Sequence, residues 1–373
     1  MYPYLVLLVV TSVANAAGTS LWVPTTPQSP KPYAIKKGLG IAMAGGNTYP
    51  VTGNSSGKAF CILNTNAGPT PGASGVFPHV HKKTYENFYS AKGRVQLWGQ
   101  NLDAYHANTS IQQTRILGPG DIGAIPPNTI HTFTLLEPDT QLTGVLVPGG
   151  FEEFFFNMNI PPSGPPDSES PTLPGAGGFD MDGLAKWDVY PQLDFVPRHD
   201  VVNGKAGPGN WYDGANSLAS GMSEPIWVAK NYGPKFLNSQ DNRHHIITPF
   251  VTGLQTNNTF SQGTITLSPF SRAETRAPVV KSAVATAFMM EEGQLEVTVE
   301  GFEPASLIDG DIVFVPPNTP FSYVATAEFT KFMYVTGGGA GLDAELMAKA
   351  KPWDSAFYPP QSSNLVVKRG IRI

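Results

Sequence analysis

Short apolar segments, each bounded by glycine, proline or asparagine, recur along most of this chain. Examples are residues 94–98, 142–147 and 295–299, which are rich in valine, leucine and threonine. Short strands separated by such turn residues are typical of antiparallel sandwiches and barrels, so we predict an all-β fold. The clearest helix pattern is residues 341–350, where apolar residues follow helical spacing and Asp343 is placed to cap the first turn.

The chain also contains a weak internal repeat. The triplet Val-Thr-Gly at residues 51–53 recurs at 251–253, and the segment that begins Gly-Asp-Ile at residue 120 recurs at residue 310. Self-similarity over this distance indicates two related units of one fold. Between the units, residues 160–178 are too rich in proline, glycine and serine to hold a strand ladder. We expect a linker here, acting either as a tether or as a lid.

Four side chains with metal-binding chemistry occur in the first unit. His79, His81 and Glu86 lie in one segment, and His131 follows a proline-rich turn. Alternate side chains of a strand share a face, so His79 and His81 should point to the same side. Three imidazoles and one carboxylate suit Cu, Fe, Ni, Zn, Mn or Co, whereas Ca and Mg prefer oxygen ligands. The sequence therefore predicts a mononuclear transition-metal site.

The segments around these four residues resemble the two-part signature of the cupin superfamily. Gly93 follows Glu86 by seven residues, and Gly120 opens the run Gly-Asp-Ile-Gly-Ala-Ile-Pro-Pro. Such turn residues bound short strands, which weighs against the alternative that the histidines are solvent-facing polar residues. Asn128 stands where the signature usually has glycine. The resemblance implies two cupin barrels, each a double-stranded β-helix or jelly roll, joined by a long linker.

These observations divide the chain into four predicted parts. Residues 1–16 are interpreted as a secretory signal, because an apolar run precedes an Ala-Asn-Ala cleavage site. Residues 17–158 are the metal-binding barrel, 159–205 the linker and 206–373 a degenerate barrel. Aligning the repeats predicts that the second barrel has lost its metal, since its counterparts of the four ligands are Val279, Lys281, Thr286 and Phe321. The histidines that we do not expect to bind metal are His106, His199, His244 and His245.

Composition narrows the compartment and the partners. The formal net charge is -5 and no run of lysine or arginine occurs, so neither nucleic acid nor an anionic membrane is an expected partner. Cys61 is the only cysteine, which excludes an intramolecular disulfide, and its apolar neighbours predict a buried thiol. We expect a secreted, extracellular glycoprotein. The glycosylation sequons are at Asn54, Asn108 and Asn257.

A closer likeness is carried by residues 75–89, 96–98, 113–115 and 138–152. These segments closely resemble fungal quercetin 2,3-dioxygenases. The resemblance implies a bicupin with one copper ion per chain, which opens the heterocycle of a flavonol with O2 and releases a depside and carbon monoxide. The ligands by themselves also fit other divalent transition metals. A homodimer is one assembly that we consider for this chain.

On matching positions the resemblance implies that His79, His81 and His131 hold the metal. Glu86 would be both a ligand and the general base that takes the proton of the flavonol 3-hydroxyl. A flat aromatic substrate needs apolar walls, and the alternative for each wall residue is ordinary core packing. The residues expected at the substrate are Phe88, Phe133, Leu142, Gly144 and Leu146, with Tyr33 as a hydrogen-bond donor near the metal carboxylate.

Two other functions stay open. A cupin oxidoreductase or decarboxylase acting on oxalate would also use three histidines and a glutamate, but it should present cationic or amide groups to its dianion rather than Phe88 and Phe133. A secreted bicupin that only binds or stores fits the degenerate second unit and the sequons. Four intact ligands in the first unit argue against that third possibility.

Overall fold

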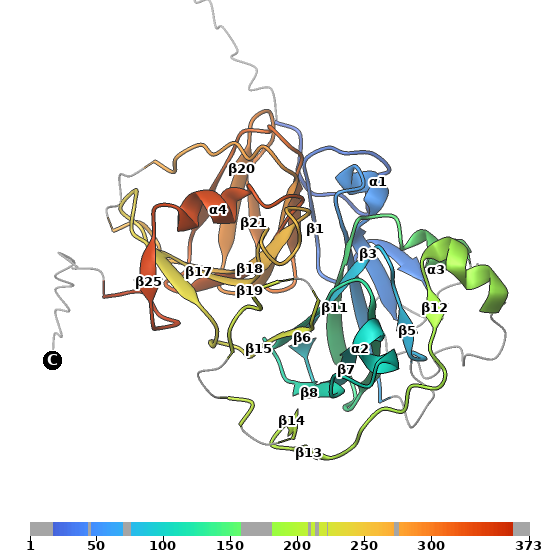
Figure 1. Ribbon diagram of the computed structural model, residues 1–373. Helices are drawn as coiled ribbons and strands as arrows, with labels where there is room; N and C mark the ends of the chain where they lie inside the picture. The colour runs from blue at the N-terminus through green and yellow to red at the C-terminus, as the bar shows by residue number, and fades with distance from the viewer. Residues whose placement is uncertain are drawn as a thin grey trace, which may run out of the picture.

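The computed structural model describes residues 18–43, 46–69, 76–157, 181–207, 210–212, 216–221, 223–271 and 276–360. The predicted signal segment and residues 160–178 of the linker lie outside this part of the chain. The described residues form two antiparallel β barrels side by side, the first blue to green and the second mostly orange to red (Figure 1). The predicted all-β fold of two barrels is confirmed. No helix in the described part is long and apolar enough to cross a membrane.

Two seven-stranded sheets build the first barrel. One runs in the order β15 (Ile226–Val228), β9 (Ile122–Ile125), β6 (Tyr85–Lys92), β11 (Thr140–Val147), β4 (Cys61–Ala67), β3 (Asn47–Val51) and β2 (Ile41–Met43). The other runs β12 (Tyr190–Pro191), β5 (His79–Val80), β10 (Thr129–Leu135), β7 (Val95–Asn101), β8 (Gln113–Leu117), β14 (Lys205–Ala206) and β13 (Val201–Val202). Its short helices are α1 (Gly53–Ser56), α2 (Leu102–His106), α3 (Glu153–Asn157) and the 3-10 helix η2 (Met181–Trp187).

The second barrel has one large and one small sheet. The large one runs β1 (Tyr33–Ile35), β22 (Ile312–Val315), β19 (Thr286–Glu292), β24 (Thr330–Thr336), β18 (Ser261–Leu267), β17 (His245–Val251), β16 (Lys235–Asn238) and β25 (Lys351–Trp353). The small one runs β21 (Ala305–Leu307), β20 (Leu295–Val299) and β23 (Phe321–Ala325). One helix, α4 (Leu342–Met347), follows β24.

The two barrels exchange edge strands. β1 comes from the start of the chain but pairs with β22, so Tyr33 lies opposite Phe314 in the second barrel. β15 comes from beyond the linker but pairs with β9, so Ile226 lies opposite Ala124 in the first. Each exchanged strand satisfies backbone groups at a sheet edge that would otherwise be exposed. The boundaries at 17–158 and 206–373 stay a prediction, and these two strands pair across them.

An apolar core joins the barrels. Val145 and Val147 of β11 share one buried cluster with Met333 and Val335 of β24. The alternate residues of β11 face the interior of the first barrel, which explains why residues 142–147 read as an almost uninterrupted apolar run. Both faces of this strand are buried, one in the first barrel and one against the second. Hydrophobic packing therefore fixes how the two barrels lie relative to each other.

The turns of the internal repeat have the same backbone conformation in both barrels. Gly93 and Gly293 have φ of 70° and 77°, and a Cβ at Gly93 would lie 2.6 Å from Thr140 Oγ1. Asn128 and Asn318 both have φ of 61°. Asparagine is among the few residues other than glycine that adopt this left-handed conformation readily. The departure of Asn128 from the usual glycine therefore leaves the turn intact.

Aromatic rings fill the interior of the second barrel. The ring of Phe288 lies 4.8 Å from Phe332 and 6.0 Å from Phe321, measured between centroids. Tyr334 lies opposite Phe288 on the neighbouring strand, in the register that Gly144 and Phe88 share in the first barrel. A large side chain thus stands where the first barrel has glycine. The prediction that apolar side chains fill this barrel is confirmed.

The predicted alignment of the repeats was wrong by one residue at the first two ligand positions. Val280 forms an antiparallel bridge with Phe321, just as His79 pairs with His131. The structural counterparts of His79 and His81 are therefore Val280 and Ser282, since a one-residue slip moves every side chain of a strand to the other face. Neither residue supplies a metal ligand of the imidazole kind. The counterparts expected from the sequence, Val279 and Lys281, are exposed.

The helix predicted at residues 341–350 is present as α4, but Asp343 does not cap it. The N-cap is Gly341, without a side-chain hydrogen bond. Asp343 lies in the first turn with 1% of its surface exposed, and its Oδ1 accepts a hydrogen bond from Thr336 Oγ1 at 3.3 Å. Burial raises the pKa of the Asp343 carboxyl to about 6. Its ionisation near neutral pH therefore costs stability.

We expect Asp343→Asn to stabilise the protein at neutral pH. The folded state holds its proton up to about pH 6, whereas the unfolded chain loses it near the ordinary value, so stability falls across that window as pH rises. The variant lacks this loss, and its advantage should grow to about 2–3 kcal/mol above pH 6. Thermal unfolding midpoints between pH 4 and 8 measure it. Asp309→Asn, at an exposed carboxylate paired with Lys37, is the control. A difference independent of pH would contradict the assignment.

Candidate metal centre

The four residues predicted as ligands meet inside the first barrel. One ligand atom from each of His79, His81, Glu86 and His131 lies within 4.8 Å of all the others. Glu86 Oε2 is 3.1 Å from His81 Nε2, 2.9 Å from His131 Nε2 and 3.9 Å from His79 Nε2. All three imidazoles are buried, and the Glu86 side chain is 12% exposed. The predicted cluster of donors is confirmed.

The two sheets of the barrel bring these side chains together. His79 begins β5 and pairs directly with His131 on the adjacent strand β10. His81 follows β5 by one residue and lies two positions from His79. Glu86 comes from β6 of the facing sheet. Strand pairing brings His131 next to His79 within one sheet, and packing of the two sheets brings Glu86 to them across the barrel.

Backbone carbonyls orient all three imidazole rings. The Nδ1 atoms of His79 and His131 each lie 2.9 Å from the carbonyl oxygen two residues earlier in the chain. Nδ1 of His81 lies 2.7 Å from the carbonyl oxygen of Asp188. Donation of the Nδ1 proton to a carbonyl leaves Nε2 as the metal-binding nitrogen and fixes the ring plane. Every histidine therefore presents the same atom to the centre.

Burial and mutual pairing together set the charges of the donors. Burial holds the pKa of His79 well below its usual range, and the neighbouring His131 and His81 add to this effect. Burial also acts to lower the pKa of His81, but the hydrogen bond and charge of Glu86 outweigh it and raise that pKa. For Glu86, burial acts to raise the pKa, whereas hydrogen bonds from His131 and His81 bring it well below its usual value. Glu86 is therefore an anion at neutral pH.

The donor set fits a divalent transition ion. Three imidazole nitrogens and one carboxylate oxygen are borderline donors, suited to Cu, Zn, Fe, Mn, Co or Ni. The carboxylate offsets part of the cation's charge in a buried site, where an unpaired charge would be costly. No comparable group of four donors occurs elsewhere in the described residues, and the remaining histidines stay outside the cluster.

Two aromatic residues form an apolar wall beside the donors. The ring of Phe88 lies 5.9 Å from His131 and 5.3 Å from Phe133, measured between centroids. Leu142 packs in the same cluster. A Cβ built on Gly144 would have Leu63 as its nearest neighbour at 3.6 Å, an ordinary contact, so glycine leaves free space on this wall. These positions agree with the predicted substrate wall, while contact with a substrate stays a prediction.

Tyr33 has other surroundings than the prediction gave it, whereas the place of Leu146 at the substrate stays a prediction. The Tyr33 hydroxyl donates to the carbonyl of Pro50 at 2.8 Å and lies 3.1 Å from Ser55 Oγ, and its ring packs on Phe314. The predicted hydrogen bond from Tyr33 to the metal carboxylate is therefore wrong, because β1 belongs to the sheet of the second barrel. Leu146 is fully buried in a small cluster. Its neighbours there include Tyr49, Cys61 and Leu63.

Three residues near the centre escaped the sequence prediction. Phe151 lies 4.7 Å from the His81 ring, between centroids. Tyr49 is buried, its hydroxyl has no hydrogen-bond partner among the described residues, and Glu86 is one of the charges that raise its pKa after burial itself. Asp188 bonds to His81 from 107 residues away. The motif Gly149-Gly150-Phe151 could have indicated Phe151 from the sequence. No local pattern indicates Tyr49 or Asp188.

The side chains of all three sequon asparagines are exposed. Asn54 lies on α1, Asn108 follows α2, and Asn257 precedes β18. The lone Cys61 is buried and unpaired, as predicted. Exposure is what glycan attachment needs, so the structure leaves all three sites accessible.

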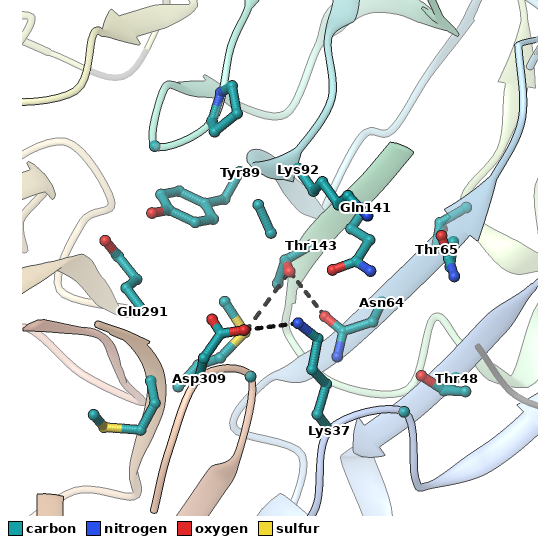
Figure 2. Close-up of a pocket in the computed structure, with 18 of the residues that line it drawn as sticks. Lys37, Thr48, Asn64, Thr65, Tyr89, Lys92, Gln141, Thr143, Glu291 and Asp309 are labelled. Carbon is teal, nitrogen blue, oxygen red and sulfur yellow. Dashed lines mark hydrogen bonds and ion pairs between the residues drawn. The ribbon is translucent and has the colours of Figure 1, made fainter. Parts of the chain in front are cut away.

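A separate hollow lies between the two barrels (Figure 2). Its volume is about 240 Å³, and its lining includes Asn64 and Thr143 of the first barrel and Glu291 of the second. Thr143 Oγ1 donates to Asn64 Oδ1 at 2.8 Å. Lys37 and Asp309 form an ion pair at the edge of this hollow. None of the four metal donors is among its lining residues, so this hollow is distinct from the metal centre.

Two antiparallel barrels, of which the first holds three histidines and a glutamate, define a bicupin metalloenzyme. The chain is 39% identical over 355 residues to quercetin 2,3-dioxygenase of Aspergillus japonicus, covering 91% of this chain and 99% of that protein. It is 28% identical over 144 residues to quercetin 2,3-dioxygenase of Bacillus subtilis, covering 37% of this chain and 38% of that protein. The chain therefore belongs to the quercetin 2,3-dioxygenase family.

Two further comparisons add nothing about activity. No family model matches the chain. Among solved structures, an oxalate decarboxylase from Lactobacillus farciminis in complex with formate is 11% identical, with a TM-score of 0.44 over 78% of this chain and 80% of that chain. A likeness this distant carries no argument about the substrate.

Proposed function

We propose that this protein is a secreted, copper-dependent flavonol 2,3-dioxygenase. Its substrate would be quercetin or a related flavonol, and its products a depside and carbon monoxide. The observation that carries the proposal is the cluster of His79, His81, Glu86 and His131 beside the aromatic wall of Phe88 and Phe133. The family membership of the chain supports the same reaction.

Glu86 is placed to start the reaction. A flavonol becomes electron-rich enough to react with O2 only after its 3-hydroxyl has lost a proton. Glu86 is ionised and partly accessible, so its carboxylate can accept this proton. When bound, the metal ion supplies Lewis-acid chemistry that stabilises the resulting oxyanion.

The apolar wall orients the substrate and keeps water away. Phe88 and Phe133 present their rings on one side of His131, where a flat flavonol can pack against them. A small dianion such as oxalate would need cationic or amide partners at this place instead. The aromatic lining therefore favours the flavonol over oxalate as substrate.

The proposal also includes the identity of the metal, copper, and the secretion of the protein. Copper is supported by the resemblance to the fungal enzymes and by a donor set that suits it, alongside other divalent ions. Secretion is supported by the signal pattern of residues 1–16 and by the three exposed sequons. A single cysteine is compatible with an oxidising compartment, because no disulfide has to form.

Turnover of quercetin tests the function directly. Purified protein loaded with Cu²⁺ should bleach the yellow absorbance of quercetin under air and release carbon monoxide. A flavone that lacks the 3-hydroxyl should be inert, because Glu86 would have no proton to remove. Oxalate should be left unchanged. Inertness toward quercetin, or turnover of oxalate, would contradict the proposal.

A further inference from the structure

The linker pairs with the strand that carries His79 and leads directly to His81. β12, which follows η2 within the linker, pairs with β5, so Tyr190 lies opposite Val80 and Pro191 opposite His79. The backbone N–H of the next residue, Gln192, donates to the carbonyl of Pro78 at 2.8 Å. The linker thus forms the outer edge of the sheet at the ligand strand.

Asp188, just before this pairing, holds the loop that connects the ligand strand to Glu86. Its Oδ1 accepts the backbone N–H of Lys82 at 3.0 Å. Its Oδ2 accepts the backbone N–H groups of Lys83 and Thr84, both at 2.9 Å, and the Thr84 hydroxyl at 3.0 Å. One carboxylate therefore receives four hydrogen bonds from three consecutive residues. Bonds to an ionised acceptor are roughly twice as strong as neutral ones.

The backbone of the same residue orients a ligand. The carbonyl oxygen of Asp188 accepts the Nδ1 proton of His81 at 2.7 Å, the shortest of the three carbonyl contacts to the ligand rings. Asp188 has φ of 64°, which places its carbonyl and its carboxylate on the same loop at once. His79 and His131 take their carbonyl partners from two residues earlier in their own segments. His81 alone depends on the linker.

In the second barrel, which lacks the four donors, the corresponding loop is held by hydrogen bonds within the loop itself. There the hydroxyl of Ser282 accepts the backbone N–H of Val284 at 3.2 Å and donates to the carbonyl of the same residue at 2.9 Å. Among the described residues, no carboxylate from the linker reaches this loop. The external contact therefore occurs at the loop that orients a metal ligand and is missing where no ligand has to be oriented.

We infer that Asp188 is a positioning residue that couples docking of the linker to metal affinity. The inference rests on the proposed metal site and goes beyond it, because it gives the linker a function other than tether or lid. Docking fixes the ring of His81 in the metal-binding orientation. By linkage, metal binding must in turn stabilise the docked linker by the same factor.

Asp188→Asn tests this coupling with the metal alone. Asparagine tolerates the left-handed conformation as aspartate does, so the variant removes the charge without adding backbone strain. We expect the Kd for Cu²⁺, measured against a competing chelator, to rise about 10- to 100-fold, as is usual when a group that supports a ligand is lost. The Cu²⁺ electron paramagnetic resonance spectrum should change as well. The matched control is Asp194→Asn, an exposed linker carboxylate that, among the described residues, receives one long hydrogen bond from Tyr105.

Hydrogen exchange on the unaltered protein provides a second test that needs no variant. Loading with Cu²⁺ should slow exchange of the Gln192 amide and of the amides of Lys82, Lys83 and Thr84 by a factor comparable to the change in affinity. An unchanged Kd and spectrum in Asp188→Asn, with faster exchange at those amides, would show a merely structural contact and overturn the inference. Exchange that is insensitive to Cu²⁺ in the parent would overturn it too. Neither measurement uses a flavonol, so the outcome is independent of the proposed reaction.

Discussion

Replacing Glu86 with glutamine should lower kcat for quercetin by about 10²- to 10⁴-fold, the usual contribution of a general base. Glutamine has nearly the same shape, but its amide cannot accept the proton of the 3-hydroxyl. The aromatic wall of Phe88 and Phe133 is untouched, so the Kd for the flavonol should change only a few-fold. Turnover and binding must be measured separately, on protein whose metal content has been determined, because the amide is also a weaker ligand than the carboxylate.

The matched control is Glu137→Gln. Glu137 lies on the surface of the same barrel and pairs with Arg94. It has no role in the proposed reaction. It should leave both turnover and binding at the parent level. Near-parent turnover in Glu86→Gln with the metal retained would remove Glu86 as the base, and equal losses of turnover and binding would make it a binding residue only.

His131→Phe should abolish metal binding, because it rebuilds in the first barrel the arrangement that the second one has. Phe321 occupies the corresponding position and packs 6.0 Å from Phe288, in the way that a phenylalanine at residue 131 would meet Phe88. The substitution removes one donor and fills space with a ring, so metal content should fall from about one ion per chain to below about a tenth. Turnover of quercetin should disappear with it.

Elemental analysis of the purified variant and parent measures this effect, and a thermal melt shows whether the variant is folded. His106→Gln serves as the control, since His106 is exposed at the end of α2 and outside the donor cluster. It should keep the parent's metal content. An unchanged content in His131→Phe would exclude His131 as a ligand, and a parent value near two ions per chain would contradict the assignment of metal to the first barrel alone.

The metal centre could be predicted because its information is local. His79 and His81 share a face through the two-residue period of a strand, and Glu86 follows in the next strand. Only His131 is distant, and the repeated Gly-Asp-Ile motif that precedes it marks its place. The same local patterns predicted the two β barrels, because turn residues and apolar runs directly report strand ends and buried faces.

The errors share a physical origin in contacts between distant segments. Tyr33 was expected near Glu86, but its strand pairs with the second barrel, which no local pattern of the first unit indicates. The predicted alignment of the second unit was off by one residue at Val280. Only the pairing of Val280 with Phe321 shows which side chains of this segment face the barrel interior. Asp188 stands in a segment that reads as linker, and its role appears only through its bonds to residues 81–84.

The sequence by itself determined the class of fold, the four donors and the absence of the corresponding donors from the second barrel, since each follows from residue type and strand periodicity. The tertiary structure decided which strands cross between the barrels, which tyrosine lies near Glu86 and what orients His81. Those features depend on hydrogen bonds and packing between segments up to hundreds of residues apart. The free energy of these contacts depends on the tertiary arrangement of the whole chain. Local sequence patterns around each residue therefore do not predict them.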